Sequence, residues 1–206
     1  MQTRRSGFTL VELSIVLIII GLIIGGVMKG TDMINSAKQK KFYTTFVKGW
    51  QVAINQHQDR TGQLLSDGLL NGGLAGVANG TFDNIVLDAA NSTVEVRLTA
   101  IGLDVPVTNI AGNPGRYTME GKFATGQVIA RMRQQSINAV QRNVFQMANV
   151  PTDVAIAIDT MIDGTADAGM GDARITAAQG TLLVDSVGLT WGNAQTVPTV
   201  TMSIQL

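Results

Sequence analysis

The strongest constraint on this chain is an apolar run of 21 residues near the amino terminus, from Phe8 to Met28, that contains a single acid, Glu12. Roughly 20 apolar residues are enough to span a bilayer as a helix. A carboxylate inside such a span costs roughly 2.5–3.5 kcal/mol on insertion scales, which indicates a functional role. Lys29 and Asp32 follow the run, where a cleaved secretory signal would have a small-x-small site. A plain membrane anchor fits the length but leaves Glu12 unexplained.

The stretch GFTLVELSIVLIIIGLI, residues 7–23, resembles the amino-terminal signature of type IV prepilins and of the related secretion pseudopilins. The resemblance implies that a prepilin peptidase cuts between Gly7 and Phe8 and methylates the new amine of Phe8. It also implies that Glu12 pairs with the terminal amine of a neighbouring subunit during assembly. Arg4 and Arg5 carry the charge of the leader, which we expect to stay on the cytoplasmic side.

From this resemblance we expect a structural subunit, a major or minor pilin, of a type IV pilus-like filament. Its partners would be copies of itself and other pilins, the prepilin peptidase, an inner-membrane assembly platform and, before assembly, membrane lipid. The chain would cross the inner membrane once and then enter an extracellular or periplasmic filament. Two alternatives stay open, a pseudopilin of a type II secretion system and a membrane-anchored binding protein that does not assemble.

The helix is expected to continue beyond the membrane, which divides the chain into four segments. These segments are a leader over 1–7, a transmembrane or filament-core helix over 8–28, an amphipathic continuation over 29–60 and a globular head over 61–206. In the continuation, apolar residues recur every three or four positions, as on one face of a helix. The residues expected on this face are Ala37, Tyr43, Phe46, Val47, Trp50, Ile54 and His57. Gly62 is expected to end the helix as a left-handed cap.

The head has the patterns of both helices and strands, so we expect an α+β, pilin-like fold with the long helix packed on an antiparallel β-sheet. Strands are predicted over 116–123, 173–176, 181–187 and 198–206. Helices are predicted after a capping box at 92–95 and with Pro151 in a first helical turn. Residues 128–150 fit either a helix or a strand, and the Gly-rich stretch 64–80 is expected to be a surface loop. The sequence has no cysteine, which excludes disulfides and thiolate metal sites.

The charge of the chain is segregated although its net value is zero. Residues 29–60 have six basic and two acidic residues (+4), whereas residues 61–206 have seven and twelve (−5). An acidic, Gly-rich stretch in the head could supply the oxygen ligands that calcium prefers. The candidate ligands are Asp159, Asp163, Asp167 and Asp172. Apart from this calcium candidate, we expect no cofactor.

Two other classes of function have little support. DNA binding needs a basic stripe, for which Arg131, Arg133 and Arg142 are candidates, but the acidic balance of the head argues against it. The single histidine, His57, is expected to pack against the head. Because the sequence has no P-loop, nucleophile elbow or zinc-binding pair, we do not expect an enzyme.

Overall fold

The computed structural model of the whole chain describes all residues except 1–6, 8, 75, 88–92 and 177–188. The chain forms two compact units, Met1–Lys38 and Gln39–Leu206.

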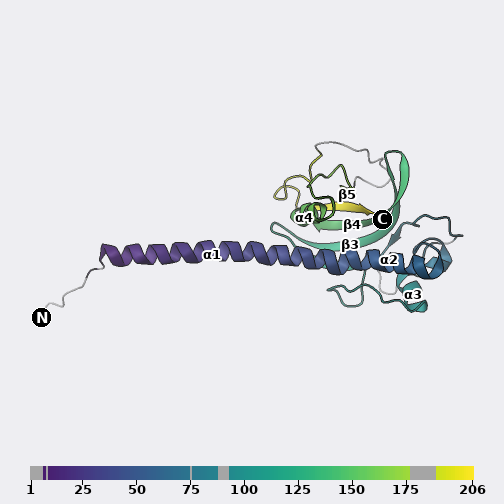
Figure 1. Cartoon of the computed structure of the whole chain (residues 1–206), viewed down its shortest axis with the longest axis horizontal. Coiled ribbons are helices and arrows are strands. Elements are labelled where there is room, and N and C mark those ends of the chain that lie inside the picture. Colours follow the sequence, from purple (N-terminus) through teal and green to yellow (C-terminus); the bar gives the residue numbers. More distant parts are fainter. Residues whose placement is uncertain (1–6, 8, 75, 88–92, 177–188) are drawn as a thin grey trace. The chain divides into compact units, whose positions relative to one another are not determined.

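One helical stretch of 52 residues covers Leu10–Thr61. It consists of the α-helix α1 (Leu10–Phe42), a π-helical turn η1 (Tyr43–Val47) and the α-helix α2 (Lys48–Thr61) (Figure 1). The predicted long helix is therefore confirmed, although Phe8 lies outside the described residues. Gly62 ends it as predicted, with a φ of 69° and its N–H donating to the Gln58 carbonyl at 2.8 Å.

The π-helical turn decides which residues of the helix are buried. The residues buried as predicted are Phe46, Val47, Trp50, Ile54 and His57. Phe42 is also fully buried, and Tyr43 is half-buried and packs against the core, whereas the prediction was wrong for Ala37, which is exposed. A π turn holds about one residue more than an α turn. It therefore rotates the preceding residues by about one position and brings Phe42 onto the buried face.

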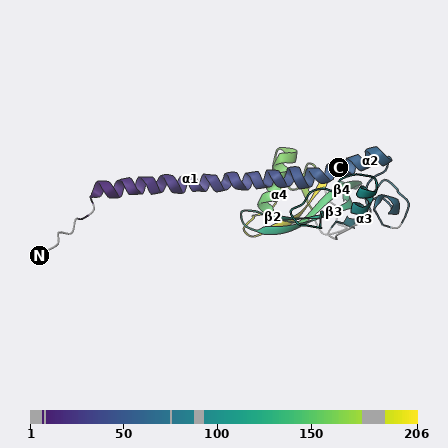
Figure 2. The same ribbon diagram turned by 90° about the horizontal axis from the view of Figure 1, so that it is seen from below.

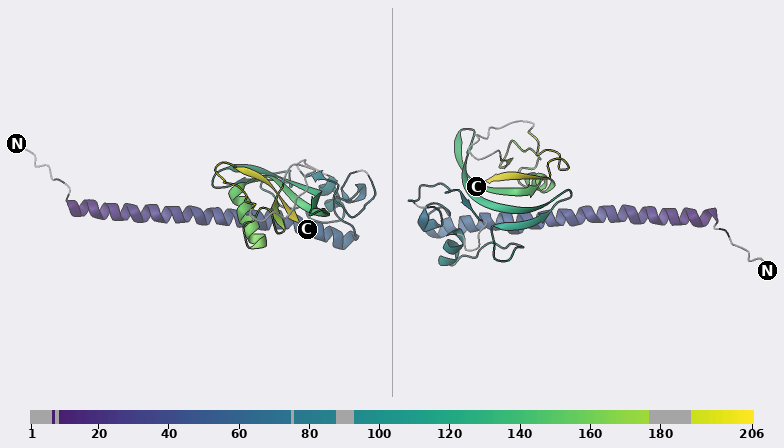
Figure 3. Two further views of the ribbon diagram at one scale, coloured as in Figure 1. Left: turned by 90° about the horizontal axis from the view of Figure 1, so that it is seen from above. Right: turned by 180° about the vertical axis from the view of Figure 1, so that it is seen from behind.

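The described strands of the head form one six-stranded antiparallel sheet in the order β1-β3-β4-β6-β5, with β2 also paired to β3. The strands are β1 (Ile85–Val86), β2 (Arg116–Glu120), β3 (Thr125–Ile137), β4 (Val140–Pro151), β5 (Ala173–Ile175) and β6 (Thr199–Gln205). Figure 3 shows the long strands β3 and β4 curving together. The fold is the predicted α+β arrangement of a long helix with an antiparallel sheet.

The strand predictions over 116–123, 173–176 and 198–206 correspond to β2, β5 and β6, while 181–187 lies outside the described residues. The ambiguous stretch 128–150 is a β-hairpin. Asn138 and Ala139 take φ values of 51° and 62°, which a tight two-residue hairpin turn requires.

Two further helices belong to the head, α3 (Thr93–Ala100) and α4 (Thr152–Asp163). Both were predicted, although Ser92 of the capping box lies outside the described residues. Pro151 is not in the first turn of α4, because it ends β4 with a ψ of 134°. Helix α3 lies near the carboxyl end of α2 (Figure 2), where Arg60 Nη1 donates to the Ile101 carbonyl at 2.8 Å.

The stretch 64–80 is largely irregular, as predicted, but much of it is not on the surface. Its buried residues include Leu65, Ser66, Asp67 and Asn71. The Asp67 carboxylate accepts the N–H groups of Asn79 at 2.8 Å and Gly80 at 2.6 Å, and Asp83 accepts two further N–H groups of this loop. These carboxylates replace the backbone partners that a helix or strand would supply. Composition alone does not reveal such a role.

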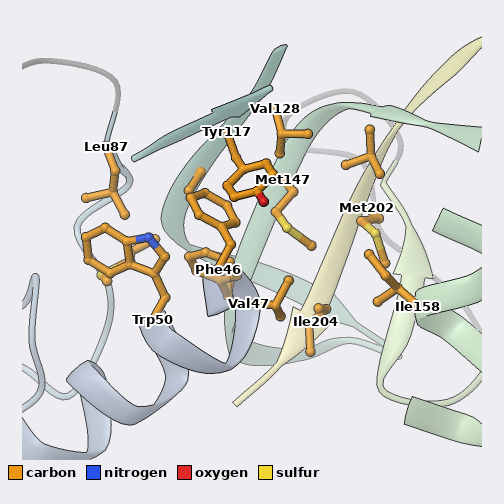
Figure 4. Close-up of a cluster of buried hydrophobic side chains, with 14 of the residues drawn as sticks. Phe46, Val47, Trp50, Leu87, Tyr117, Val128, Met147, Ile158, Met202 and Ile204 are labelled. Carbon is orange, nitrogen blue, oxygen red and sulfur yellow. The ribbon is translucent and has the colours of Figure 1, made fainter. Parts of the chain in front are cut away.

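Aromatic side chains form the centre of the head's core. Phe42 stacks on Phe46 with ring centroids 5.4 Å apart, and both rings contact Tyr117 of β2. Trp50 stacks on Phe145 of β4 at 6.4 Å. Figure 4 shows Phe46 and Val47 of η1, Trp50 of α2 and Ile158 of α4 among sheet residues such as Met147 and Met202, and all of these side chains belong to one buried hydrophobic cluster.

Gly115 should not tolerate a side chain, because a Cβ there would coincide with the Leu87 carbonyl. Overpacking of this kind costs about 1–3 kcal/mol. We expect Gly115→Ala to lower the thermal unfolding midpoint by several degrees. The control, Gly49→Ala on α2, has 3.5 Å of room to Pro106 and should be neutral or stabilising by up to about 1 kcal/mol. Equal midpoints for the two variants would contradict this packing.

Candidate functional site

The apolar part of α1 is exposed along its whole length. Within the part of the chain that the structure describes, the stretch containing α1 is the one helix that is long and apolar enough to cross a membrane. Every residue from Leu10 to Met28 is exposed, and Leu10 is 88 % exposed. A contiguous apolar surface of this size is unfavourable in water. It therefore requires lipid or other apolar chains around it.

Three glycines leave this helix open to close approach by another helix. Gly21, Gly25 and Gly26 have no heavy atom within 4 Å of the position that a Cβ would take. Gly21 and Gly25 are four residues apart, the small-xxx-small spacing that lets helix backbones pack closely in a membrane.

Thr9 and Glu12 form reciprocal hydrogen bonds at the start of α1. The Thr9 N–H donates to Glu12 Oε2 at 2.8 Å, and the Thr9 hydroxyl donates to the same oxygen at 3.0 Å. The Glu12 N–H donates to the Thr9 hydroxyl oxygen at 3.2 Å. This is a capping box, in which two orphan donors of a helix start are satisfied. The sequence analysis missed it, although the T-x-x-E spacing of Thr9 and Glu12 was its visible signal.

The capping box leaves the two carboxylate oxygens of Glu12 with different hydrogen bonding. Oε2 is bound by its own chain, whereas the described residues form no hydrogen bond to Oε1. Polar groups in hydrocarbon must find partners within the protein. A carboxylate with one oxygen held and the other open suits a helix that first resides in lipid and later meets a cation. The predicted processing junction is only partly described: Gly7 is exposed, while Phe8, Arg4 and Arg5 lie outside the described residues.

Three of the four aspartates predicted as calcium ligands, Asp159, Asp163 and Asp167, accept other hydrogen bonds through their carboxylates. Asp163 accepts the N–H groups of Asp172 at 3.0 Å and Ala173 at 2.9 Å, and Asp167 accepts the Gly169 N–H at 2.9 Å. Among the described residues, no group of three or more His, Cys, Asp or Glu side chains is placed to hold a metal ion. The calcium site therefore gains no geometric support.

Asp159 differs from the other three aspartates because it is completely buried. Its Oδ2 accepts the indole N–H of Trp191 at 2.7 Å, while its buried Oδ1 has no hydrogen bond within the distance criteria among the described residues, with Asp163 and the Asp167 backbone close by. Burial raises the pKa of Asp159 from 3.8 to about 6, the Trp191 hydrogen bond opposes this, and the neighbouring Asp163 adds to it. The site favours a neutral carboxyl group.

The amino-terminal part of the chain has a recognised counterpart. Residues 2–28 match the family model described as the prokaryotic N-terminal methylation motif. The chain carries the type IV prepilin signature. No curated protein and no solved structure matches the chain significantly.

The prepilin signature accounts for the features that a plain anchor left unexplained. The matched residues contain the Gly7–Phe8 junction, Glu12 and the exposed apolar helix. The motif supports a precursor of the type IV pilin-like or pseudopilin kind. The motif and the apolar helix fit anchoring in the inner membrane.

His57 is a packed histidine, as predicted. It is completely buried, with Nδ1 3.0 Å from the Gln63 carbonyl, and Arg97 Nε donates to its Nε2 at 3.3 Å. Burial lowers the pKa of His57. These contacts fit a neutral ring with its proton on Nδ1, which links α2 to α3 through Arg97.

Asp159→Asn should remove a pH dependence from the stability of the protein. A pKa raised from 3.8 to about 6 means that the folded state binds more protons than the unfolded state between these values. The free energy of unfolding of the wild type should therefore fall as the pH rises through this window. Asparagine still accepts the Trp191 N–H but does not ionise, so the variant should lack this fall and be the more stable protein at neutral pH.

Thermal unfolding of the two proteins at a series of pH values measures this difference. Asp104→Asn removes an exposed carboxylate and serves as the control. It should keep the fall in stability seen in the wild type. A wild type as stable at neutral pH as at pH 4, or an Asp159→Asn variant with the same profile as the wild type, would contradict the prediction.

Proposed function

We propose that this prepilin is the precursor of a structural subunit, a major or minor pilin, of a type IV pilus-like filament. The observation that carries the proposal is the methylation motif on a helix whose apolar residues from Leu10 to Met28 are all exposed. Such a helix can exchange a lipid environment for other copies of itself without exposing apolar surface to water.

Maturation would take place at the cytoplasmic face of the inner membrane. Prepilin peptidase would cut between Gly7 and Phe8, leaving 199 of the 206 residues, and methylate the new amine of Phe8. Arg4 and Arg5 would hold the leader on the cytoplasmic side, because basic residues next to a span remain inside. The head would then lie on the opposite side of the membrane.

Assembly would depend on Glu12. An unpaired charge in hydrocarbon costs roughly 2.5–3.5 kcal/mol or more. The capping box with Thr9 holds Oε2 within the subunit. Glu12 would then pair with the methylated amine of a neighbouring copy, which retains its positive charge. This pairing would favour the filament over lipid and fix the axial position of each new subunit.

The partners would be copies of the chain, other pilins, the prepilin peptidase and an inner-membrane assembly platform. A pseudopilin of a type II secretion system has the same motif, so it remains the alternative within this class. A membrane-anchored binding protein that does not assemble is the alternative from another class. It differs in one measurable respect, because its function would not require Glu12.

The mature protein should begin at Phe8. Mass spectrometry of the native amino-terminal peptide should find this residue about 14 Da heavier than unmodified phenylalanine, as expected for one methyl group. Gly7→Val should retain the leader, because a bulky residue hinders close approach of the peptidase to the backbone. Native protein that still carries residues 1–7 would exclude the proposed maturation.

Glu12→Gln should separate assembly from membrane insertion. The variant keeps the size of the side chain but loses its charge, so it should stay in the membrane fraction while its incorporation into sheared filaments falls at least tenfold. Thr9→Val removes the hydroxyl of the capping box and should cause a smaller loss. The control is Ser14→Ala, which removes a hydroxyl bonded to the Val11 carbonyl on the same helix.

Filament yield against membrane content of each variant is the measurement. Wild-type incorporation by Glu12→Gln, or an equal loss in Ser14→Ala, would exclude the proposed role of Glu12. If the wild type forms no filament and Glu12→Gln keeps every function of the protein, the anchored binding protein is the correct assignment.

A further inference from the structure

Most of the basic residues of the head lie on one face of the sheet. Residues directly opposite each other in antiparallel strands share a face, as do residues two apart along a strand. Met132 and Phe145 are paired on the face that packs against α2, so their neighbours Arg131 and Arg133 lie on the other face. Five of the seven basic residues of 61–206 lie on that other face by register: Arg116, Arg131, Arg133, Arg142 and Arg174.

Arg133 is buried there without an anionic partner among the described residues. Its side chain is 8 % exposed, and its Nη1 donates to the Gln146 amide oxygen at 3.4 Å, a long hydrogen bond. The Nε atoms of Arg133 and Arg131 are both buried without a hydrogen-bond partner. Burial, followed by the positive charge of Arg131, lowers the pKa of Arg133. The charged group that acts on Arg133 is therefore a second cation.

The acids that the register places at this face are distant from Arg133. Glu120 pairs with Thr125, eight positions along β3, which corresponds to about 26 Å at 3.3 Å per residue. Asp172 precedes β5, three strands away from β3, which corresponds to about 14 Å. Neither carboxylate can neutralise the pair, and a buried unpaired cation is strongly unfavourable.

We propose that Arg131 and Arg133 form a binding site for a small oxyanion with two negative charges, a phosphate or a sulfate group. Two guanidinium groups two positions apart on one strand face require two negative charges, which one carboxylate does not supply. Arginine donates pairs of N–H groups in a geometry that matches these oxyanions. The small exposed fraction of Arg133 favours a compact ligand over a polymer that binds across the surface.

Several neighbouring side chains are polar and suit such a ligand, although the residue directly opposite Arg133 is the buried Val144. Gln146 lies opposite Arg131 and is 2 % exposed, and Ser203 lies opposite Gln146. The Ser203 hydroxyl donates to the Gln135 amide oxygen at 3.0 Å. The amide nitrogen of Gln135 is a neutral donor by its chemistry.

The test uses the full-length protein in detergent micelles, with low millimolar inorganic phosphate or sulfate added to chloride buffer at constant ionic strength. Binding is measured by calorimetry and by the thermal unfolding midpoint. Wild type should bind either ion, and Arg133→Met should bind at least tenfold more weakly. Without the ion, Arg133→Met should be at least as stable as wild type, because it removes a buried unpaired charge. Arg142→Met, an exposed arginine on the same face, should bind like wild type.

Several results would overturn the site. These are no binding by wild type, unchanged affinity in Arg133→Met, or an equal loss in Arg142→Met. If Arg133→Met does not fold, Arg133→Lys replaces it, since lysine keeps the charge but lacks Nε and the paired donors. Unchanged affinity in Arg133→Lys would also overturn the site.

A single-stranded oligonucleotide distinguishes a free ion from a phosphate on a larger molecule. Binding that competes with phosphate and requires Arg133 would support the same site with a tethered phosphate. Oligonucleotide binding that depends on Arg142 and not on Arg133, without binding of the free ions, would overturn it in favour of a surface charge effect. Filament formation is measured separately, so failure of the anion site and failure of the filament proposal are distinct results.

Discussion

The exposed apolar side chains of Leu10–Met28 are the constraint on which the rest of this protein depends, because water solvates such a surface only at a large free-energy cost. Lipid satisfies them, and so would other copies of the same helix. A helix that must be stable both in lipid and among other copies of itself can have few polar groups, and each polar group needs a hydrogen-bond partner. Glu12 is the acid in this segment, and the capping box with Thr9 gives it a partner within its own chain.

The head has to be stable without a disulfide, since the sequence contains no cysteine. Its stability rests on the part of the helix from Phe42 onward, one face of which is buried against the sheet. Four large rings, Phe42, Phe46, Tyr117 and Phe145, connect the helix to β2 and β4. The π-helical turn belongs to this arrangement, because it brings Phe42 onto the buried face. Carboxylates in the long loop after α2 then satisfy backbone groups that lack partners in regular structure.

Burial disfavours the charged forms of three titratable groups, and their surroundings differ in how they offset this cost. His57 becomes a neutral donor and acceptor between Gln63 and Arg97. Asp159 has a raised pKa, so that its neutral form is favoured next to Trp191. Arg133 cannot become neutral near physiological pH, since guanidinium groups stay protonated. The described residues supply no anion beside it, and the proposed bound oxyanion would compensate its charge.

The sequence by itself determined the long helix, its end at Gly62, the α+β class and the prepilin signature. Each of these follows from local information: an apolar run, a residue type that tolerates positive φ, alternating patterns or a short motif. The tertiary structure decided what depends on contacts between distant residues. The stretch 128–150 became a hairpin because β3 and β4 bury Met132 and Phe145 together, and the arginines of one face came together only through strand register. A spacing rule for α-helices missed the burial of Phe42, because it contains no information about the π turn that follows this residue.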